Sequence, residues 1–234
     1  MESPKYKRIL LKLSGEALGG ERGTGYDTDV LKDVCSQIKQ VAESGVEVAL
    51  VVGGGNFWRG RQGMNMERTT ADYMGMLATA MNALALSDAL EHAGVKSRVM
   101  TALSIDKIGE PYNRKNAMKY LSDGEVVIFA CGTGHPYFST DTGASLRASE
   151  IEADVILLAK NVDGIYDSDP KLNPNAKKYD VVSYVEYIER GLKAMDMTAI
   201  AMCMENHIPV LAFGFEKNSI VRVMNGESLG TLIK

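Results

Sequence analysis

The pattern of apolar positions predicts strands that alternate with helices. Nearly continuous apolar runs, typical of strands covered on both faces of a sheet, occupy residues 9–13, 46–52, 98–102, 126–130, 155–158 and 210–213. Apolar residues at three- and four-residue intervals predict helices over residues 28–42, 69–92, 142–152, 182–190 and 198–206. Repeated strand–helix–strand units predict an α/β fold: an open, mostly parallel twisted sheet with helices on both faces, in three layers.

Two regions depart from this alternation. Residues 164–178 are rich in Asp, Asn, Pro and Lys, which predicts a polar hairpin or loop. Residues 231–233 form a short apolar run near the end of the sequence and predict a last edge strand. Because no linker or repeat interrupts the chain, we expect one domain with two lobes, about 1–150 and about 151–234, without a flexible joint.

Composition narrows the class of protein. The 234 residues are 45% hydrophobic and 24% charged, which is typical of a globular protein, and the formal net charge of −4 argues against nucleic-acid binding. Cys35, Cys131 and Cys203 are far apart, so neither a disulfide framework nor a zinc site is predicted, and reduced cysteines suit the cytoplasm. The apolar run at 73–86 contains Asn82 and predicts a buried helix, not a membrane span. No apolar signal region follows the first residues.

Three glycine-rich stretches each follow a predicted strand, at residues 12–15, 53–59 and 132–141. The carboxyl ends of parallel strands lie at one edge of a sheet, where ligands bind. Glycine lets backbone N–H groups approach phosphate oxygens, and Lys12 and Arg59 add positive charge. The stretches therefore predict a phosphate pocket, although the P-loop and dinucleotide fingerprints are absent.

Metal ligation by side chains is not predicted. The three histidines lack metal-ligand spacing, and the acidic residues at 163–169 lack the glycine and terminal glutamate of a calcium loop. The sequence leaves open whether Trp58 lies in the core or flanks the pocket.

Six motifs resemble those of the bacterial uridylate kinases, a branch of the amino-acid kinase family. They are RILLKLSGEA at 8–17, GGGN at 53–56 with Arg59, DYMGMLAT at 72–79, GTGHPYFSTD at 132–141, AKNVDGIY at 159–166 with Asp169, and KAMD at 193–196. Their order and spacing match along essentially the whole chain. The lysine motif indicates only the wider family, whereas 72–79 and 133–141 are specific to the uridylate branch. The resemblance implies transfer of the γ-phosphoryl group of ATP to UMP in pyrimidine nucleotide biosynthesis.

The resemblance also implies residue roles. The catalytic residues would be Lys12, Arg59, Asp141 and Asp196, with Lys12 bridging the transferred group and the two aspartates orienting the lysine and the loops. UMP would contact Gly54, Asp72 through its ribose hydroxyls, and Thr133, Gly134, His135, Pro136, Tyr137, Phe138, Ser139 and Thr140. ATP would contact Lys12, Leu13, Ser14, Gly15, Gly55, Arg59, Asn161, Tyr166 and Asp169.

Further expectations follow from the same resemblance. Mg²⁺ would be held mainly by nucleotide phosphates, and the enzyme would be a cytoplasmic homohexamer with neither nucleic acid nor membrane as a partner. UTP would inhibit it. GTP would activate it through the segment Gly20, Glu21, Arg22, Gly23, Thr24 and Gly25.

Phosphoryl transfer depends on positioning and electrostatic stabilisation, and an acceptor that is already a phosphate anion needs no strong general base. Two alternatives remain. A relative with the same fold could phosphorylate a carboxylate or carbamate, but it would not need the loop at 133–141. A non-catalytic nucleotide-binding protein could keep the glycines while losing Lys12 or Asp196, and both are present.

Overall fold

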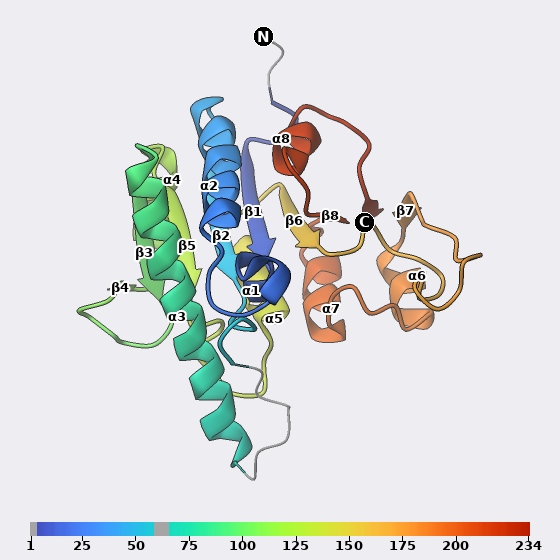
Figure 1. The fold of residues 1–234 in the computed structure, drawn as a ribbon, viewed down its shortest axis with the longest axis horizontal. Helices are drawn as coiled ribbons and strands as arrows, with labels where there is room; N and C mark the ends of the chain where they lie inside the picture. Colours follow the sequence, from blue (N-terminus) through green and yellow to red (C-terminus); the bar gives the residue numbers. More distant parts are fainter. Residues whose placement is uncertain (1–3, 59–65) are drawn as a thin grey trace.

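The computed structural model describes residues 4–58 and 66–234. Over these residues one sheet of nine strands runs through the molecule in the order β4-β3-β5-β2-β1-β6-β8-β9-β7 (Figure 1). Every strand pair is parallel except β8–β9. The strands are β1 Arg8–Leu13, β2 Glu47–Val52, β3 Ser97–Thr101, β4 Glu110–Pro111, β5 Val126–Ala130, β6 Val155–Lys160, β7 Val181–Val182, β8 Val210–Gly214 and β9 Thr231–Ile233.

Helices cover both faces of the sheet, as predicted. One face carries α1 Gly15–Leu18, α2 Thr28–Glu43, α3 Arg68–His92 and α8 Ser219–Met224. The other carries α4 Arg114–Ser122, α5 Thr140–Glu150, α6 Tyr184–Glu189 and α7 Met197–Glu205. Successive strand residues point to opposite faces, so Ile9 and Leu11 pack in one apolar core and Leu10 in the other. The three-layer α/β fold is confirmed.

The N-terminal part of α3 projects beyond the sheet (Figure 1). Its middle is packed against the sheet through small and apolar side chains such as Ala83 and Leu86, both fully buried. Among the described residues, none of the helices combines the length and the hydrophobicity needed to cross a lipid bilayer.

The structure corrects one strand and adds elements that the periodicity missed. β9 was expected at the edge of the sheet, but it pairs with β8 on one side and with β7 on the other. β7 has two residues and β4 has two, too few for a periodic signal, and α4 and α8 are short helices outside the predicted pattern. The predicted hairpin at 164–178 is present, because Tyr166 and Lys178 form an antiparallel bridge.

The position of β1 decides where a ligand can bind. β1 pairs with β2 on one side and with β6 on the other, so the chain connections diverge at this strand. In open α/β sheets, ligands bind outside the carboxyl ends of the strands at such a switch point. The candidate site lies there.

Candidate active site

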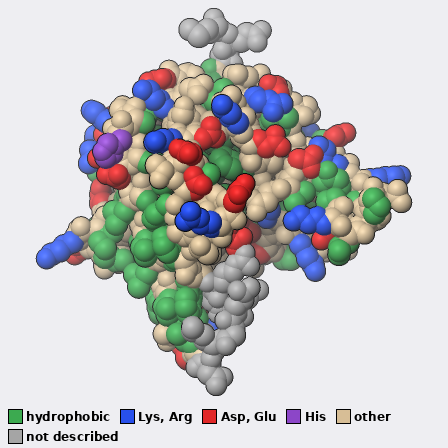
Figure 2. Space-filling view, in the orientation of Figure 1, with side chains coloured by type: hydrophobic (Ala, Val, Ile, Leu, Met, Phe, Trp, Pro, Cys, Tyr) green, Lys and Arg blue, Asp and Glu red, His purple; other side chains and the backbone are tan. Residues whose placement is uncertain are grey.

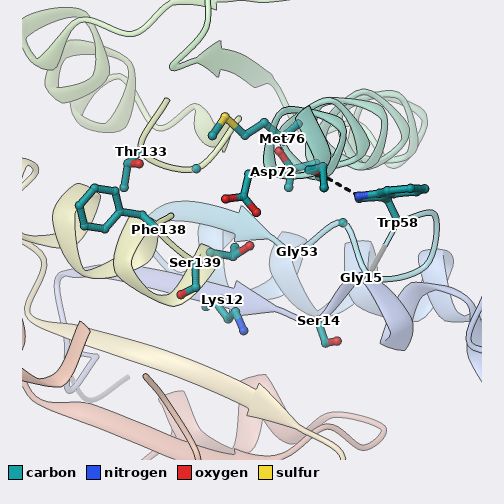
Figure 3. Close-up of a pocket in the computed structure, with 17 residues that line it drawn as sticks. Lys12, Ser14, Gly15, Gly53, Trp58, Asp72, Met76, Thr133, Phe138 and Ser139 are labelled. Atoms are coloured by element: carbon teal, nitrogen blue, oxygen red, sulfur yellow. Dashed lines mark hydrogen bonds between the residues drawn. The ribbon is translucent and has the colours of Figure 1, made fainter. Parts of the chain in front are cut away.

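A pocket of about 280 Å³ opens at the carboxyl ends of β1, β2 and β5, against the side of α3 (Figure 3). The three glycine-rich stretches that the sequence singled out meet at this pocket. Its lining residues are Lys12, Ser14, Gly15, Gly53, Gly54, Gly55, Trp58, Ala71, Asp72, Gly75, Met76, Thr79, Gly132, Thr133, Phe138, Ser139 and Thr140.

The loop after β2 fits tightly between α3 and the loop after β1, which explains Gly54 in the first of these loops and Gly15 in the second. A Cβ atom added to Gly54 would lie 2.8 Å from the Cβ of Ala78 and 2.8 Å from the carbonyl oxygen of Gly75 in α3. A Cβ added to Gly15 would overlap the carbonyl oxygen of Gly53. Only glycine permits these approaches. They bring the backbone of both loops to the floor of the pocket.

Lys12 provides the fixed positive charge of the pocket. It lies near the end of β1 and is only 9% exposed, yet its side chain reaches the pocket wall. Its Nζ is 2.7 Å from Oδ1 of Asp141, in the first turn of α5. The other carboxylate oxygen of Asp141 accepts the backbone N–H of Asp196 at 3.3 Å. Asp141 therefore holds the ammonium group in place at the pocket.

The Asp196 carboxylate forms hydrogen bonds at the N-termini of both α5 and α7. Its Oδ1 accepts the N–H of Ala199 at 2.8 Å, which caps α7. The hydroxyl of Thr142 donates to the same carboxylate at 3.2 Å, and the hydroxyl of Ser139 donates to it as well. Ser139 also caps α5. Asp196 is thus linked to Lys12 through Asp141, so Asp196 can orient the lysine without contacting a ligand itself.

The loop between β5 and α5 folds back onto α3. The N–H of Tyr137 donates to Oδ2 of Asp72 at 2.8 Å, and the guanidinium of Arg68 lies 4.6 Å from the centre of the Tyr137 ring. Tyr137 and Gly134 both have left-handed backbones, with φ of 73° and 82°. Asp72 of α3 therefore lines one cavity together with Thr133 and the C-terminal residues of the loop (Figure 3).

A further lysine lies next to this network. Lys160 ends β6, and its Nζ donates to the carbonyl oxygen of Ala194 at 2.7 Å. Burial lowers its pKa, and the positive charge of Lys12 lowers it further. The sequence shows Lys160 at the end of an apolar run, but no pattern in it indicates that this lysine lies near Lys12.

A second pocket, of about 410 Å³, lies beyond β6 and β8. Asn161 and Tyr166 line it, together with Asp163 and Phe215. The Tyr166 hydroxyl donates to Asp163 at 2.7 Å and lowers the pKa of that carboxyl group, and the Lys178 ammonium, 3.0 Å away, lowers it further.

Residues 7–213 match the amino acid kinase family. The chain belongs to this family. Solved structures of family members are similar over nearly their whole length. A UMP kinase from Bacillus anthracis is 36% identical with a TM-score of 0.94, covering 98% of this chain and 96% of its own. A UMP kinase from Ureaplasma parvum is 40% identical with a TM-score of 0.93, covering 98% and 99%. A uridylate kinase from Archaeoglobus fulgidus is 28% identical with a TM-score of 0.73, covering 97% and 99%.

The amino acid kinase fold distributes the predicted residues over three places. Those that line the first pocket are Lys12, Ser14, Gly15, Gly54, Gly55, Asp72, Thr133, Phe138, Ser139 and Thr140. Those in the adjoining loop and helix start, outside the lining, are Gly134, His135, Pro136, Tyr137, Asp141 and Asp196. Asn161 and Tyr166 lie at the second pocket.

Three predicted residues need separate comment. The side chain of Leu13 is buried in the core, and its carbonyl oxygen accepts the N–H of Gly53, so its side chain does not face the pocket. Asp169 does not line the second pocket; it caps a turn by accepting the N–H of Lys171 at 2.9 Å. Arg59 lies outside the described residues.

The structure answers the question that the sequence left open about Trp58. Its ring lines the first pocket, and its indole N–H donates to the carbonyl oxygen of Ala71 at 2.9 Å (Figure 3). Sequence reasoning also missed Met76 and Thr79 as lining residues. Both lie in the predicted helix, and only its packing beside the glycine loop gives them this role.

Within residues 4–58 and 66–234, no three His, Cys, Asp or Glu side chains form a group that could hold a metal ion. The carboxylates at and beside the pocket already have partners: Asp72 accepts the N–H of Tyr137, Asp141 is paired with Lys12, and Asp196 is bonded to the starts of α5 and α7. Lys12, the glycine backbones and the start of α5 give this pocket groups that can bind an anion.

Proposed function

We propose that this protein is an ATP-dependent UMP kinase, which transfers the γ-phosphoryl group of ATP to UMP and gives UDP and ADP in pyrimidine nucleotide biosynthesis. The observation that carries the proposal is the first pocket, which combines an anion-binding floor at Lys12 with Asp72 and the 133–140 loop on one wall. The likeness to UMP kinases at 36% and 40% identity over nearly the whole chain supports the same activity.

In the proposed reaction, the chain's own residues position two phosphate groups and neutralise the charge that develops between them. The Lys12 ammonium contacts the transferred group, and the backbone N–H groups of Gly54 and Gly55 face UMP and ATP. Asp72 accepts hydrogen bonds from the ribose hydroxyls of UMP, and the 133–140 loop surrounds the base and phosphate. Arg59, which lies outside the described residues, is expected to contact the ATP phosphates. No residue is required as a strong base, because the attacking oxygen belongs to a phosphate anion.

The adenine nucleotide would extend from Lys12 toward Asn161 and Tyr166 in the second pocket. Mg²⁺ would neutralise charge on the phosphate oxygens. Because the nearby carboxylates are engaged with Lys12 and with helix starts, the ion would be held mainly by the nucleotide phosphates.

We assign residues 1–150 to the acceptor lobe and 151–234 to the ATP lobe. The placement of β2, β3 and β5 on one side of β1, and of β6, β8 and β9 on the other, supports this division.

An ADP-release assay with a panel of acceptors tests the activity. UMP, CMP, dUMP, aspartate, acetylglutamate and carbamate are each offered with Mg-ATP. We expect turnover with UMP and little with the carboxylates and carbamate. Turnover on a carboxylate or carbamate without turnover on UMP would assign the pocket to another kinase of the family. Absence of turnover on every acceptor, with ATP still bound, would indicate a nucleotide-binding protein.

We also propose that the enzyme assembles through α3. Tyr73, Leu77, Met81 and Leu84 are spaced along one face of this helix and are between 41% and 49% exposed. Hydrophobic side chains gather on this part of the surface (Figure 2). An apolar stripe of this kind suits contact with a second copy, and a homohexamer is our expectation for the assembly.

Regulation by nucleotides is part of the proposal. UTP shares the uridine group of UMP and would compete for the acceptor pocket. For GTP activation we propose the segment 20–25, since Arg22, Gly23 and Thr24 line a further pocket of about 420 Å³ that shares Gly55 and Trp58 with the first.

The three cysteines are buried and form no disulfide, which suits the reducing cytoplasm as the proposed compartment.

A further inference from the structure

Two asparagine side chains form a closed pair behind the glycine loop. Asn56 follows this loop and is 3% exposed, and Asn82 lies in the middle of α3 and is fully buried. Nδ2 of Asn56 lies 3.0 Å from Oδ1 of Asn82, and Nδ2 of Asn82 lies 2.7 Å from Oδ1 of Asn56. The two amides therefore both donate to and accept from each other.

Each amide uses its second N–H to hold a different segment. Asn82 donates to the carbonyl oxygen of Gly53 at 2.7 Å, and Asn56 donates to the carbonyl oxygen of Gly25 at 2.8 Å. The N–H of Gly25 donates in return to the backbone oxygen of Asn56 at 3.2 Å. All four amide N–H bonds of the pair thus have partners. The pair joins α3, the glycine loop after β2 and the end of the 20–25 segment.

The pair does not line the first pocket, and Asn56 lines the pocket next to the 20–25 segment. Gly53, whose carbonyl oxygen Asn82 holds, does line the first pocket. On the other side, a Cβ atom added to Gly15 would come within 2.6 Å of Oδ1 of Asn56, so the β1 loop packs directly on the pair. The amides are therefore in contact with both loops that carry the phosphate-binding backbone.

Burying two amides in an apolar helix interface is unfavourable unless every polar atom is paired. Ala83 and Leu86, on the same helix, show that apolar side chains fill this interface elsewhere. Two apolar residues would pack there, but they would leave the carbonyl oxygens of Gly53 and Gly25 without these donors. A fully satisfied polar network also specifies one arrangement of its segments, whereas apolar packing permits several.

We infer that the Asn56–Asn82 amide pair is a positioning device for phosphoryl transfer, which fixes the glycine loop relative to Lys12 and α3. The inference rests on the proposed UMP kinase activity. Both residues act through the backbone of Gly53–Gly55 and do not touch the substrates. Because a displacement of about 1 Å in a reacting geometry can cost on the order of 10²-fold in rate, loss of the pair lowers kcat more than it weakens substrate binding.

Asn82→Asp is the most informative variant, because it keeps the volume and replaces one N–H₂ group by an oxygen. That oxygen would face the carbonyl oxygens of Gly53 and Asn56, both 2.7 Å from the present nitrogen. We expect kcat to fall about 10²-fold at pH 8, with KM for UMP and ATP changed by less than about threefold. A protonated carboxyl group donates one hydrogen bond, so the ratio of variant to wild-type kcat should rise as the pH is lowered to about 6.

Two companion variants make the measurement decisive. Asn56→Ala removes the other amide and should lower kcat in the same way, without the rise at low pH. Gln37→Ala is the matched control, since Gln37 is a fully buried carboxamide that accepts the N–H of Ile220 at 2.9 Å between α2 and α8. It should lower the urea midpoint of unfolding and leave kcat per folded enzyme unchanged.

Steady-state kinetics, urea unfolding and far-UV circular dichroism are measured on all four proteins. The inference is overturned if the asparagine variants behave like Gln37→Ala, losing stability while kcat per folded enzyme stays at the wild-type value. If Asn82→Asp does not yield folded protein, Asn56→Ala decides by the same criterion. Absence of UMP turnover by the wild type would instead refute the proposed function, and the wild-type assay alone decides that question.

Discussion

Replacing Lys12 by alanine tests both the electrostatics of the pocket and the proposed chemical step. The lysine is 9% exposed and its Nζ lies 2.7 Å from Oδ1 of Asp141. At an effective dielectric constant of about 20, Coulomb's law gives a gross attraction of about 6 kcal/mol at this distance. Desolvation of the two ions offsets much of it. We therefore expect a net coupling between Lys12 and Asp141 of about 1–3 kcal/mol in the free energy of unfolding.

A double-mutant cycle measures this coupling directly. Lys12→Ala, Asp141→Ala and the double variant are unfolded in urea beside the wild type. Each single variant leaves the other charge without its partner, so the double variant should be less destabilised than the sum of the two. The electrostatic account of the pair is wrong if the effects add within about 0.5 kcal/mol.

The same variants separate binding from chemistry. If Lys12 contacts the moving phosphoryl group, its charge acts most strongly in the transition state, and kcat should fall by about 10²–10³ in Lys12→Ala. Lys12→Arg should restore little, because a planar guanidinium does not replace a compact ammonium group. Single-turnover kinetics at saturating Mg-ATP and UMP give the rate of transfer, and binding titrations give the affinities. Normal transfer with weaker ATP binding alone would show that Lys12 is a binding residue.

Three further predictions concern other parts of the molecule. Gly54→Ala places a methyl group 2.8 Å from the Cβ of Ala78, so we expect a loss of about 1–3 kcal/mol in stability with lower UMP turnover; unchanged urea midpoint and kcat would contradict the packing argument. Tyr166→Phe removes the hydrogen bond that lowers the Asp163 pKa, so carboxyl NMR should show that pKa rising toward 3.8. A carboxyl group with a depressed pKa stabilises the fold at pH values above its unfolded-state pKa, and this stability is lost as the pH falls through the folded-state pKa. The variant should therefore lose less stability than the wild type below about pH 3.8. If the free energy of unfolding of both proteins fell identically at acid pH, the assignment would be refuted. Leu77→Glu introduces a charge into the exposed stripe of α3 and should dissociate the assembly in sedimentation velocity at micromolar concentration, whereas an unchanged sedimentation coefficient would exclude this face from the interface.

Local chemistry accounts for the parts of the fold that the sequence predicted. The apolar run at 126–130 and the helical period at 28–42 are set by neighbouring residues, and both elements appear within one residue of the predicted bounds. The two-residue strands β4 and β7 and the short helices α4 and α8 gave no such signal. β9 was found from its apolar residues, but its place inside the sheet depends on β7, a partner about fifty positions away in the chain. Pairing between distant segments leaves no periodic trace.

For the candidate site, the sequence by itself determined the chemistry: three glycine stretches after strands, with Lys12 beside the first, favour phosphate binding by backbone N–H groups and a fixed ammonium. Only the tertiary structure decided how these parts act together. It placed β1 between β2 and β6 and linked Lys12 to Asp196 through Asp141. It also brought the amides of Asn56 and Asn82 into reciprocal hydrogen bonds. The physical reason is that glycine's freedom and lysine's charge belong to single residues, whereas hydrogen bonds and ion pairs need two groups that folding brings within about 3 Å.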